Sequence, residues 1–352
     1  MLKDDRVTMT HGAGGAVMAK LIECYVLPYL GEGRAEVGLE ALDDAAVVDG
    51  IVFKSDSHAV RPIFFPGGDI GRLAVAGTVN DLAVLGAEPL ALACGFVLEE
   101  GLLFGDLEKV LLSMKAACDE AGVFVVTGDT KVVEKGSLGG LVVNMSGVGK
   151  RSAALDHNLA IVRKFRPDFD ARWVLDRNLQ VHDKIILSGT VGDHGLAVLS
   201  AQEGYAFGSG ITSDVKPLNR MIKGALEAGG VVSMKDPTRG GLANALNEWS
   251  QKANVGILVT EEAIPIREDV QVACEMLGID PLEVGNEGKV IIGVVEEMAE
   301  RALEALRKTE EGKEARIIGE ATDRFDLVAL ETQVGGRRIL PMPVGDPVPR
   351  IC

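Results

Sequence analysis

The stretch DIGRLAVAGTVNDLAVLGA, residues 69–87, decides the fold class, because its apolar residues recur with the period of a helix. Within it, Asp81 falls on the apolar stripe of that helix. The other members of this stripe are Ile70, Leu73, Ala74 and Gly77. We therefore expect the Asp81 carboxylate to face inward, either as a buried, hydrogen-bonded aspartate without a ligand or as part of a site.

Strand patterns flank this helix and alternate with further helical patterns. In the first half of the chain, the expected strands are IVFKSDS at 51–57, LALACGFVL at 90–98, VFVVTGD at 123–129 and GGLVVNMSGVG at 139–149, with a second helix at 106–122. In the second half, strands are expected at KIIL, VVSMK and KVIIGVV, and helices follow the last two. This alternation predicts an α/β (α+β) protein whose two domains are each a mixed β-sheet packed against helices. A chain of 352 residues with 47% hydrophobic content is long enough for two cores.

Changes in pattern divide the chain into five parts. The expected parts are an N-terminal segment 1–42 with the glycine-rich loop HGAGG, a first domain 43–150, a linker or insertion 151–182, a second α/β domain 183–337 and a flexible tail 338–352. The linker is expected because 151–182 mixes charge, aromatics and a proline without a clear period. The tail carries four prolines, which favours an extended segment over packed structure.

The composition narrows the classes of function. Acidic residues number 52 against 36 basic ones, and the resulting charge of −16 disfavours nucleic acid and anionic membranes as partners. No apolar run reaches membrane-spanning length. The five cysteines are scattered without a C-x-x-C pair, which disfavours a disulfide framework or a zinc knuckle. We therefore expect a cytoplasmic protein.

Acidic residues beside glycines or at strand ends are the main chemical signal. No G-x-x-x-x-G-K-[ST] motif occurs, and HGAGGAV does not fit G-x-G-x-x-G. Instead, acidic residues occur in LDDAAVV, FKSDSH, VTGDTK and MKDPTRGG. Hard oxygen ligands from such places suit Mg²⁺ bound to a polyphosphate.

Each of these motifs also has a purely structural interpretation. Asp43 and Asp44 fit a turn or a helix cap as well as a metal site. The pairs Asp129 with Lys131 and Asp236 with Arg239 are either local ion pairs or metal ligands beside phosphate clamps.

Four other residues are candidates because of their surroundings. His11 and His194 stand beside glycines, where an imidazole reaches a phosphate or transfers a proton, although a surface loop histidine is the alternative. Glu287 lies at the entrance to a strand and is either a general base or a solvated turn residue. Cys352 ends the proline-rich tail, and such a thiol is either a mobile reactive group or an accidental terminal cysteine.

Together these motifs resemble one known family. GTVNDLAVLGAEP and KDPTRGGL are similar to signatures of the superfamily of aminoimidazole ribotide (AIR) synthetase, selenophosphate synthetase and thiamine-monophosphate kinase, which implies an AIR-synthetase-like fold. HGAGG, LDDAAVV, VTGDTKVV, GNEGKV and the closing DPVPRIC resemble the HypE family of hydrogenase maturation proteins in order and spacing. The resemblance covers nearly the whole chain, and 151–182 departs from it by its greater length.

The resemblance implies an ATP-dependent carbamoyl dehydratase that converts ATP to ADP and phosphate. In this family, the C-terminal cysteine receives a carbamoyl group from the carbamoyltransferase HypF, and dehydration of the S-carboxamide yields a thiocyanate. The cyanide then passes to an iron held by a HypC–HypD complex and becomes a ligand of the [NiFe] hydrogenase centre. The superfamily also implies a homodimer joined through the sheets of the two N-terminal domains, with ATP near that interface.

The same resemblance assigns roles to individual residues. Cys352 carries the substrate, Glu287 is the base, and Lys131 stabilises charge on the transferred phosphate or the amide oxygen. The expected nucleotide-binding residues are His11, Asp44, Asp56, Asp81, Asp129, His194, Asp236 and Arg239. The residues expected to bind Mg²⁺ are Asp44, Asp81, Asp129 and Asp236.

Two other functions share part of this pattern. A small-molecule synthetase or kinase of the same superfamily has the acidic motifs but no use for a mobile terminal cysteine. A non-catalytic scaffold would use the tail only for docking. ATP hydrolysis measured with and without the carbamoyl donor separates these functions.

Overall fold

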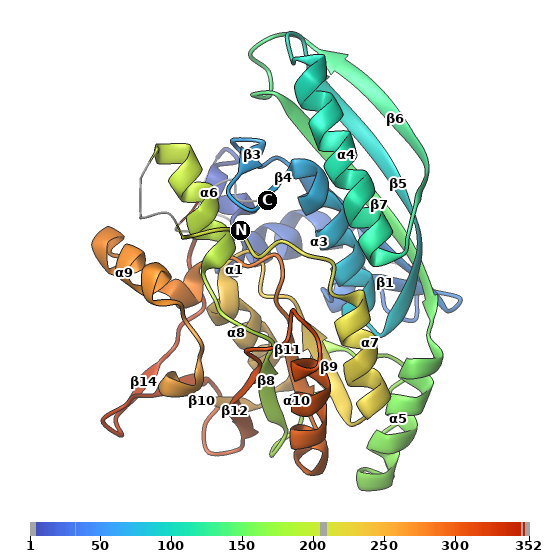
Figure 1. Ribbon diagram of the computed structural model, residues 1–352. Coiled ribbons are helices and arrows are strands. Elements are labelled where there is room, and N and C mark those ends of the chain that lie inside the picture. Colours follow the sequence, from blue (N-terminus) through green and yellow to red (C-terminus); the bar gives the residue numbers. More distant parts are fainter. Residues whose placement is uncertain (1–4, 32, 205–209, 346–347, 349–352) are drawn as a thin grey trace.

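A computed structural model describes residues 5–31, 33–204, 210–345 and 348. It has a five-stranded and a seven-stranded sheet, each with helices packed on it (Figure 1). Both sheets contain parallel and antiparallel pairs. The predicted α/β class, with two domains that are each a mixed sheet packed against helices, is confirmed.

Short helices precede the first sheet. They are η1 (Met9–Gly12), α1 (Gly15–Leu21), a π-helical turn η2 (Ile22–Val26), α2 (Leu27–Leu30) and η3 (Leu39–Ala41). The first domain then consists of β1 (Ala46–Val48), β2 (Ile51–His58), β3 (Phe64–Phe65), β4 (Gly68–Asp69), α3 (Ile70–Val84), β5 (Ala87–Glu99), α4 (Phe104–Ala121), β6 (Val125–Val133) and β7 (Leu141–Arg151). Its large sheet has the order β1-β2-β7-β5-β6, so β6 is an edge strand. The four strands and two helices expected here are all present.

One face of this sheet packs on α3, whereas the other face is open in the described part of the chain (Figure 1). On the central strand β7, buried residues alternate with more exposed ones. The open face carries both polar and apolar side chains. Among them are Phe53, Ser55, Ser57, Val142, Asn144, Ser146 and Val148.

Helix α3 lies between the two domains and is almost completely buried. The Asp69 side chain caps it by accepting hydrogen bonds from the backbone N–H groups of Gly71 (2.7 Å) and Arg72 (3.1 Å). The helix contacts the first sheet on one side and α7 (Asn219–Ala228) and β9 (Val231–Lys235) of the second domain on the other. Only 7% of Asp81 is exposed, which confirms that this residue faces inward.

The second domain is built on a sheet with the order β14-β13-β10-β12-β8-β11-β9. Its strands are β8 (Lys184–Leu187), β9 (Val231–Lys235), β10 (Gly256–Thr260), β11 (Ile291–Val294), β12 (Arg316–Thr322), β13 (Val328–Glu331) and β14 (Arg337–Ile339). Its helices are α6 (Asp193–Glu203), α7 (Asn219–Ala228), α8 (Gly241–Ala253), α9 (Glu268–Leu277) and α10 (Ala299–Arg307), with short turns η5 (Glu261–Ala263), η6 (Pro281–Glu283) and η7 (Glu296–Met298). No helix in the described residues is long and apolar enough to cross a membrane.

The segment 151–182 is more ordered than its expected role as a linker or insertion. It contains helix α5 (Ala153–Phe165) and the short turn η4 (Asp176–Asn178). The helix buries Leu155, Leu159 and Val162, which recur at helical spacing among charged residues. The sequence did not predict this helix, because the flanking charges and the proline obscure the period of its apolar residues.

Parts of the described tail pack against the protein, although its prolines suggested an extended rather than a packed segment; Ile339 and Val344 are exposed. The carbonyl of Pro343 accepts a hydrogen bond from the backbone N–H of Ala16 at 3.2 Å. Leu340 is 1% exposed, and Val348 is completely buried in the core of the first domain. Cys352 lies outside the described residues.

Candidate active site

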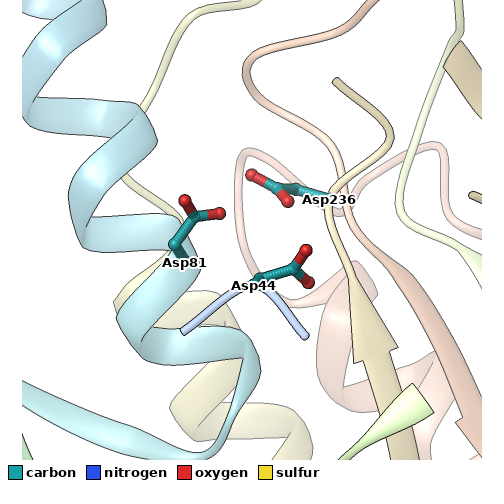
Figure 2. A group of neighbouring side chains, drawn as sticks. All are labelled: Asp44, Asp81 and Asp236. Atoms are coloured by element: carbon teal, nitrogen blue, oxygen red, sulfur yellow. The ribbon is translucent and has the colours of Figure 1, made fainter. Parts of the chain in front are cut away.

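Three carboxylates from distant parts of the sequence converge between the domains. Asp44 precedes β1, Asp81 lies on α3, and Asp236 follows β9. One oxygen of each lies within 4.8 Å of one oxygen of each of the others. Figure 2 shows the three side chains pointing toward one another. We call these three residues the acidic trio.

Burial and repulsion from neighbouring carboxylates raise the pKa values of the acidic trio. Burial is the largest cause for each residue. It raises the pKa of Asp236 to about 7, with a further contribution from the negative charge of Asp44. The pKa of Asp81 is raised well above its usual range, although Lys54 opposes the shift. A cation placed among these carboxylates would favour their ionised forms, as a hard-cation site requires.

Strand β2 points three polar side chains toward α3. Lys54, Asp56 and His58 alternate with the residues of the open face. Lys54 Nζ lies 2.5 Å from Asp81 Oδ2 and 3.2 Å from Asp56 Oδ1. Burial alone would lower the pKa of Lys54, but these carboxylates outweigh it and raise that pKa. Burial alone would raise the pKa of Asp56, but the positive charges of Lys54 and His58 outweigh burial, so the pKa of Asp56 is lowered.

The buried lysine Lys235 holds Asp44. Lys235 Nζ lies 2.8 Å from Asp44 Oδ1, 3.1 Å from Asp176 Oδ2 and 3.1 Å from Glu248 Oε2. Asp176 also accepts hydrogen bonds from Lys252 (2.7 Å) and the Trp249 indole (2.8 Å). The supposed linker therefore supplies the buried carboxylate that anchors Lys235.

Glu287 is buried beside the acidic trio, with 4% of its surface exposed. Its backbone N–H donates to Asp214 Oδ1 at 3.1 Å. Burial, followed by repulsion from Asp236 and Asp214, raises its pKa well above the usual range. The alternative of a solvated turn residue is therefore wrong.

Two cavities that share lining residues lie at the acidic trio. A small one of about 90 Å³ is lined by the acidic trio and by Lys54, Asp56, Ser57, His58, Gly77, Thr238, Arg239 and Glu287. A larger one of about 500 Å³ shares Asp44, Lys54, Asp236, Thr238 and Arg239 with it. The larger volume lies within the range of small-molecule sites. It also includes Gly14 and Gly15 of the HGAGG loop.

A third cavity, of about 810 Å³, is larger but less suited to an anionic ligand. The four cations on its wall, Arg72, Lys216, Lys289 and Lys313, each contact a carboxylate within 3.2 Å. Their charges are thus already compensated, and we take the acidic trio as the candidate active site.

Two predicted site residues lie apart from the acidic trio in a single chain. Asp129 and Lys131 are on the edge strand β6 and are exposed. Asp129 pairs across the sheet with Gly95, Asn144 and Ser57 in turn, so three strand spacings, about 14 Å, separate it from Ser57. Within one chain, Asp129 therefore does not lie with the acidic trio, which comprises the other residues expected to bind Mg²⁺.

Both candidate histidines are buried, and neither lines the two adjoining cavities. The Nδ1 atom of His11 lies 2.8 Å from the Thr8 hydroxyl oxygen. His194 Nδ1 lies 2.8 Å from the Ser213 hydroxyl oxygen, and its ring packs edge-on against Phe65. The alternative of surface loop histidines is wrong, and contact with a nucleotide stays a prediction.

Two family models match the chain, one in each domain. Residues 42–150 match the family model of the AIR synthase related protein N-terminal domain, and residues 180–330 match that of its C-terminal domain. The carbamoyl dehydratase HypE of Azotobacter vinelandii is 43% identical over 100% of this chain and 98% of its own length. The chain belongs to the HypE family.

Solved HypE structures resemble this chain over most of its length. HypE in a crystal structure of a HypE–HypF complex has a TM-score of 0.82 and 43% identity, covering 92% of this chain and 99% of its own. HypE in complex with ATP has a TM-score of 0.78 and 40% identity, covering 99% of this chain and 100% of its own. The family resemblance and the AIR-synthetase-like fold are confirmed, and the chain is assigned to the ATP-dependent carbamoyl dehydratases of hydrogenase maturation.

Sequence reasoning missed several residues that line or support the site. Lys54 and His58 flank Asp56 in FKSDSH, and their spacing of two already placed all three on one face of a strand. Lys235 directly precedes Asp236, but its partners come from distant segments. Asp176 lies in a segment without a recognised pattern and carried no signal.

Proposed function

We propose that this chain binds ATP with Mg²⁺ and dehydrates an S-carboxamide on Cys352 to a thiocyanate. The observation that carries the proposal is the meeting of the acidic trio and Glu287 in one small cavity. A cation and phosphate site thus adjoins a candidate base. The solved complex of HypE with ATP supports the nucleotide part of the proposal.

The dehydration requires both a site for the phosphates of ATP and a base. The amide oxygen is a poor leaving group. Phosphorylation by ATP lets it leave as phosphate, which is a good leaving group. Arg239 lines both adjoining cavities and is suited to contact phosphate oxygens. Glu287, once ionised, removes a proton from the amide nitrogen.

The acidic trio fits Mg²⁺, because three carboxylate oxygens converge, and burial, followed by repulsion from neighbouring carboxylates, raises their pKa values. A bound Mg²⁺ supplies charge neutralisation at the oxygens of the polyphosphate. Lys54 and Lys235 hold Asp81 and Asp44 in place.

We further propose a homodimer that forms through the open face of the five-stranded sheet. This face carries apolar side chains beside polar ones, and Phe53 is 44% exposed. Asp129 and Lys131 lie on the edge strand of the same sheet. In a dimer, they would act at the site of the partner chain.

The HypE–HypF complex supports HypF as the carbamoyl donor of this chain. We propose the HypC–HypD complex as the acceptor of the cyanide, which becomes an iron ligand of [NiFe] hydrogenase. A reducing cytoplasm suits a reactive terminal thiol.

Intact mass spectrometry tests the function. The chain is incubated with ATP, HypF and carbamoyl phosphate. We expect a carbamoyl adduct that then loses one water. A synthetase or kinase of the same superfamily would hydrolyse ATP without this adduct, and a scaffold would show neither result.

A further inference from the structure

His58 presents an unpaired polar atom beside Glu287. It ends strand β2 and is 5% exposed. Its Nε2 is buried and has no hydrogen-bond partner among the described residues. Buried polar atoms are nearly always paired, so an unpaired atom on a cavity wall indicates a group that a ligand completes. The same wall includes Glu287 and Gly77.

The absence of a side chain at Gly77 lets both groups approach α3. A carbon added at Gly77 would lie 3.2 Å from His58 Cε1, 3.9 Å from His58 Nε2 and 3.8 Å from Glu287 Oε2. The imidazole and the carboxylate therefore flank the same point of the helix. Asp81 follows one helical turn later, so this point adjoins the acidic trio.

The reaction requires two contacts at the amide nitrogen. In a balanced scheme, the amide oxygen bonds to the γ-phosphorus of ATP, ADP leaves, and the nitrogen loses its first proton. The C–O bond then breaks, phosphate leaves, the nitrogen loses its second proton, and the C≡N bond forms. Two N–H protons are lost in total, whereas one carboxylate accepts one proton at a time. A second acceptor is therefore needed to hold the other N–H group in place.

His58 is suited to this task. Burial lowers the pKa of His58 to about 4, although Asp56 opposes the shift. The imidazole is therefore neutral at physiological pH and offers one ring nitrogen as a hydrogen-bond acceptor. An uncharged primary amide matches this acceptor better than a phosphate or a carboxylate, which has no hydrogen to donate.

We propose that His58 is a further substrate-contacting residue, whose Nε2 accepts a hydrogen bond from one N–H of the carbamoyl group while Glu287 removes the other proton. Nδ1 then carries the ring proton. This inference rests on the proposed function, because the amide is the one carried by Cys352.

The test compares His58→Leu with His58→Gln in single-turnover reactions. HypF, carbamoyl phosphate and ATP are added, samples are quenched at successive times, and intact mass resolves the free, carbamoylated and dehydrated chain. We expect His58→Leu to become carbamoylated but to form the thiocyanate about tenfold more slowly or worse. His58→Gln, whose amide oxygen reaches the position of Nε2, should recover most of the rate. Both variants should bind Mg-ATP like the unaltered chain in calorimetry.

The matched control is His157→Gln, because His157 is exposed on α5. Equal dehydration rates for His58→Leu and the unaltered chain would overturn the inference. If His58→Leu does not fold, His58→Asn replaces it, since its shorter amide does not reach the position of Nε2, and equal rates for Asn and Gln would then overturn the inference. Failure of the unaltered chain to form any thiocyanate would instead refute the proposed function.

Discussion

Lys54 on β2 and Asp81 on α3 form a partly buried ion pair that joins the first sheet to the helix beneath it, with 2.5 Å between Nζ and Oδ2. Lys54 has a second partner in Asp56 at 3.2 Å. Loss of Asp81 would therefore not leave the lysine unpaired. The pair fixes the orientation of one member of the acidic trio before any ligand binds.

Asp81→Asn should weaken Mg-ATP binding about tenfold, equivalent to about 1.4 kcal/mol, because one ligand charge is lost from the acidic trio. The fold should persist, since Lys54 keeps Asp56. Calorimetry measures the affinity, and Asp119→Asn on the exposed face of α4 is the control. An unchanged affinity in a folded variant would remove Asp81 from the site.

Glu287→Gln should bind Mg-ATP and accept the carbamoyl group, yet stall before the thiocyanate forms, because an amide does not remove a proton. Intact mass spectrometry should show the carbamoylated chain accumulating. Glu283→Gln, on a nearby half-buried turn, should react normally. Normal dehydration by Glu287→Gln would mean that another group is the base.

Cys352→Ser should carry no carbamoyl group, since a hydroxyl is scarcely ionised at neutral pH. The buried cysteines Cys94, Cys118 and Cys274 are poor competitors. Burial raises the pKa of Cys94 to about 11 and that of Cys274 to about 12. Their alanine variants should remain active. Peptide mapping of the adduct to any cysteine other than Cys352 would contradict this prediction.

Stabilisation by Mg²⁺ in the presence of ATP should be greater at about pH 8 than at about pH 6. Burial and Asp44 raise the pKa of Asp236 to about 7, so the folded chain holds a proton that the unfolded chain loses near pH 4. The contribution of this group to stability is thus present at low pH and is lost as pH rises through 7. Mg²⁺ binds the ionised form and must displace the proton at the lower pH.

Melting temperatures with and without Mg²⁺ at both pH values measure this effect. Asp236→Asn should reduce the difference between the two pH values, and Asp106→Asn, at the start of α4, should not. An equal Mg²⁺ effect at both pH values in the unaltered chain would argue against Asp236 as a ligand.

Val148→Glu should convert the proposed dimer into a monomer, because it places a charge at the centre of the open face beside Phe53. Sedimentation velocity distinguishes the two states. Val334→Glu is the control, since Val334 is 93% exposed elsewhere. A dimer that survives Val148→Glu would place the interface on another surface.

The sequence predicted the features that depend on local pattern. The period of 69–87 was sufficient to predict α3 and the inward direction of Asp81. The convergence of Asp44 and Asp236 on Asp81 was not readable from spacing, because it depends on how two sheets pack around α3. Helix α5 was not predicted, because charged residues interrupt its apolar stripe of Leu155, Leu159 and Val162.

The burial of Val348 limits how Cys352 meets another protein. Only three residues lie between the two, so four Cα–Cα steps keep their Cα atoms within about 14 Å while Val348 stays in place. The thiol is then on a short tether, and its local concentration near this part of the surface is high. A donor enzyme either works within that radius or first extracts one valine side chain, at a cost of about 1.5–3 kcal/mol. In the second case, release of the tether would slow carbamoylation about tenfold or more.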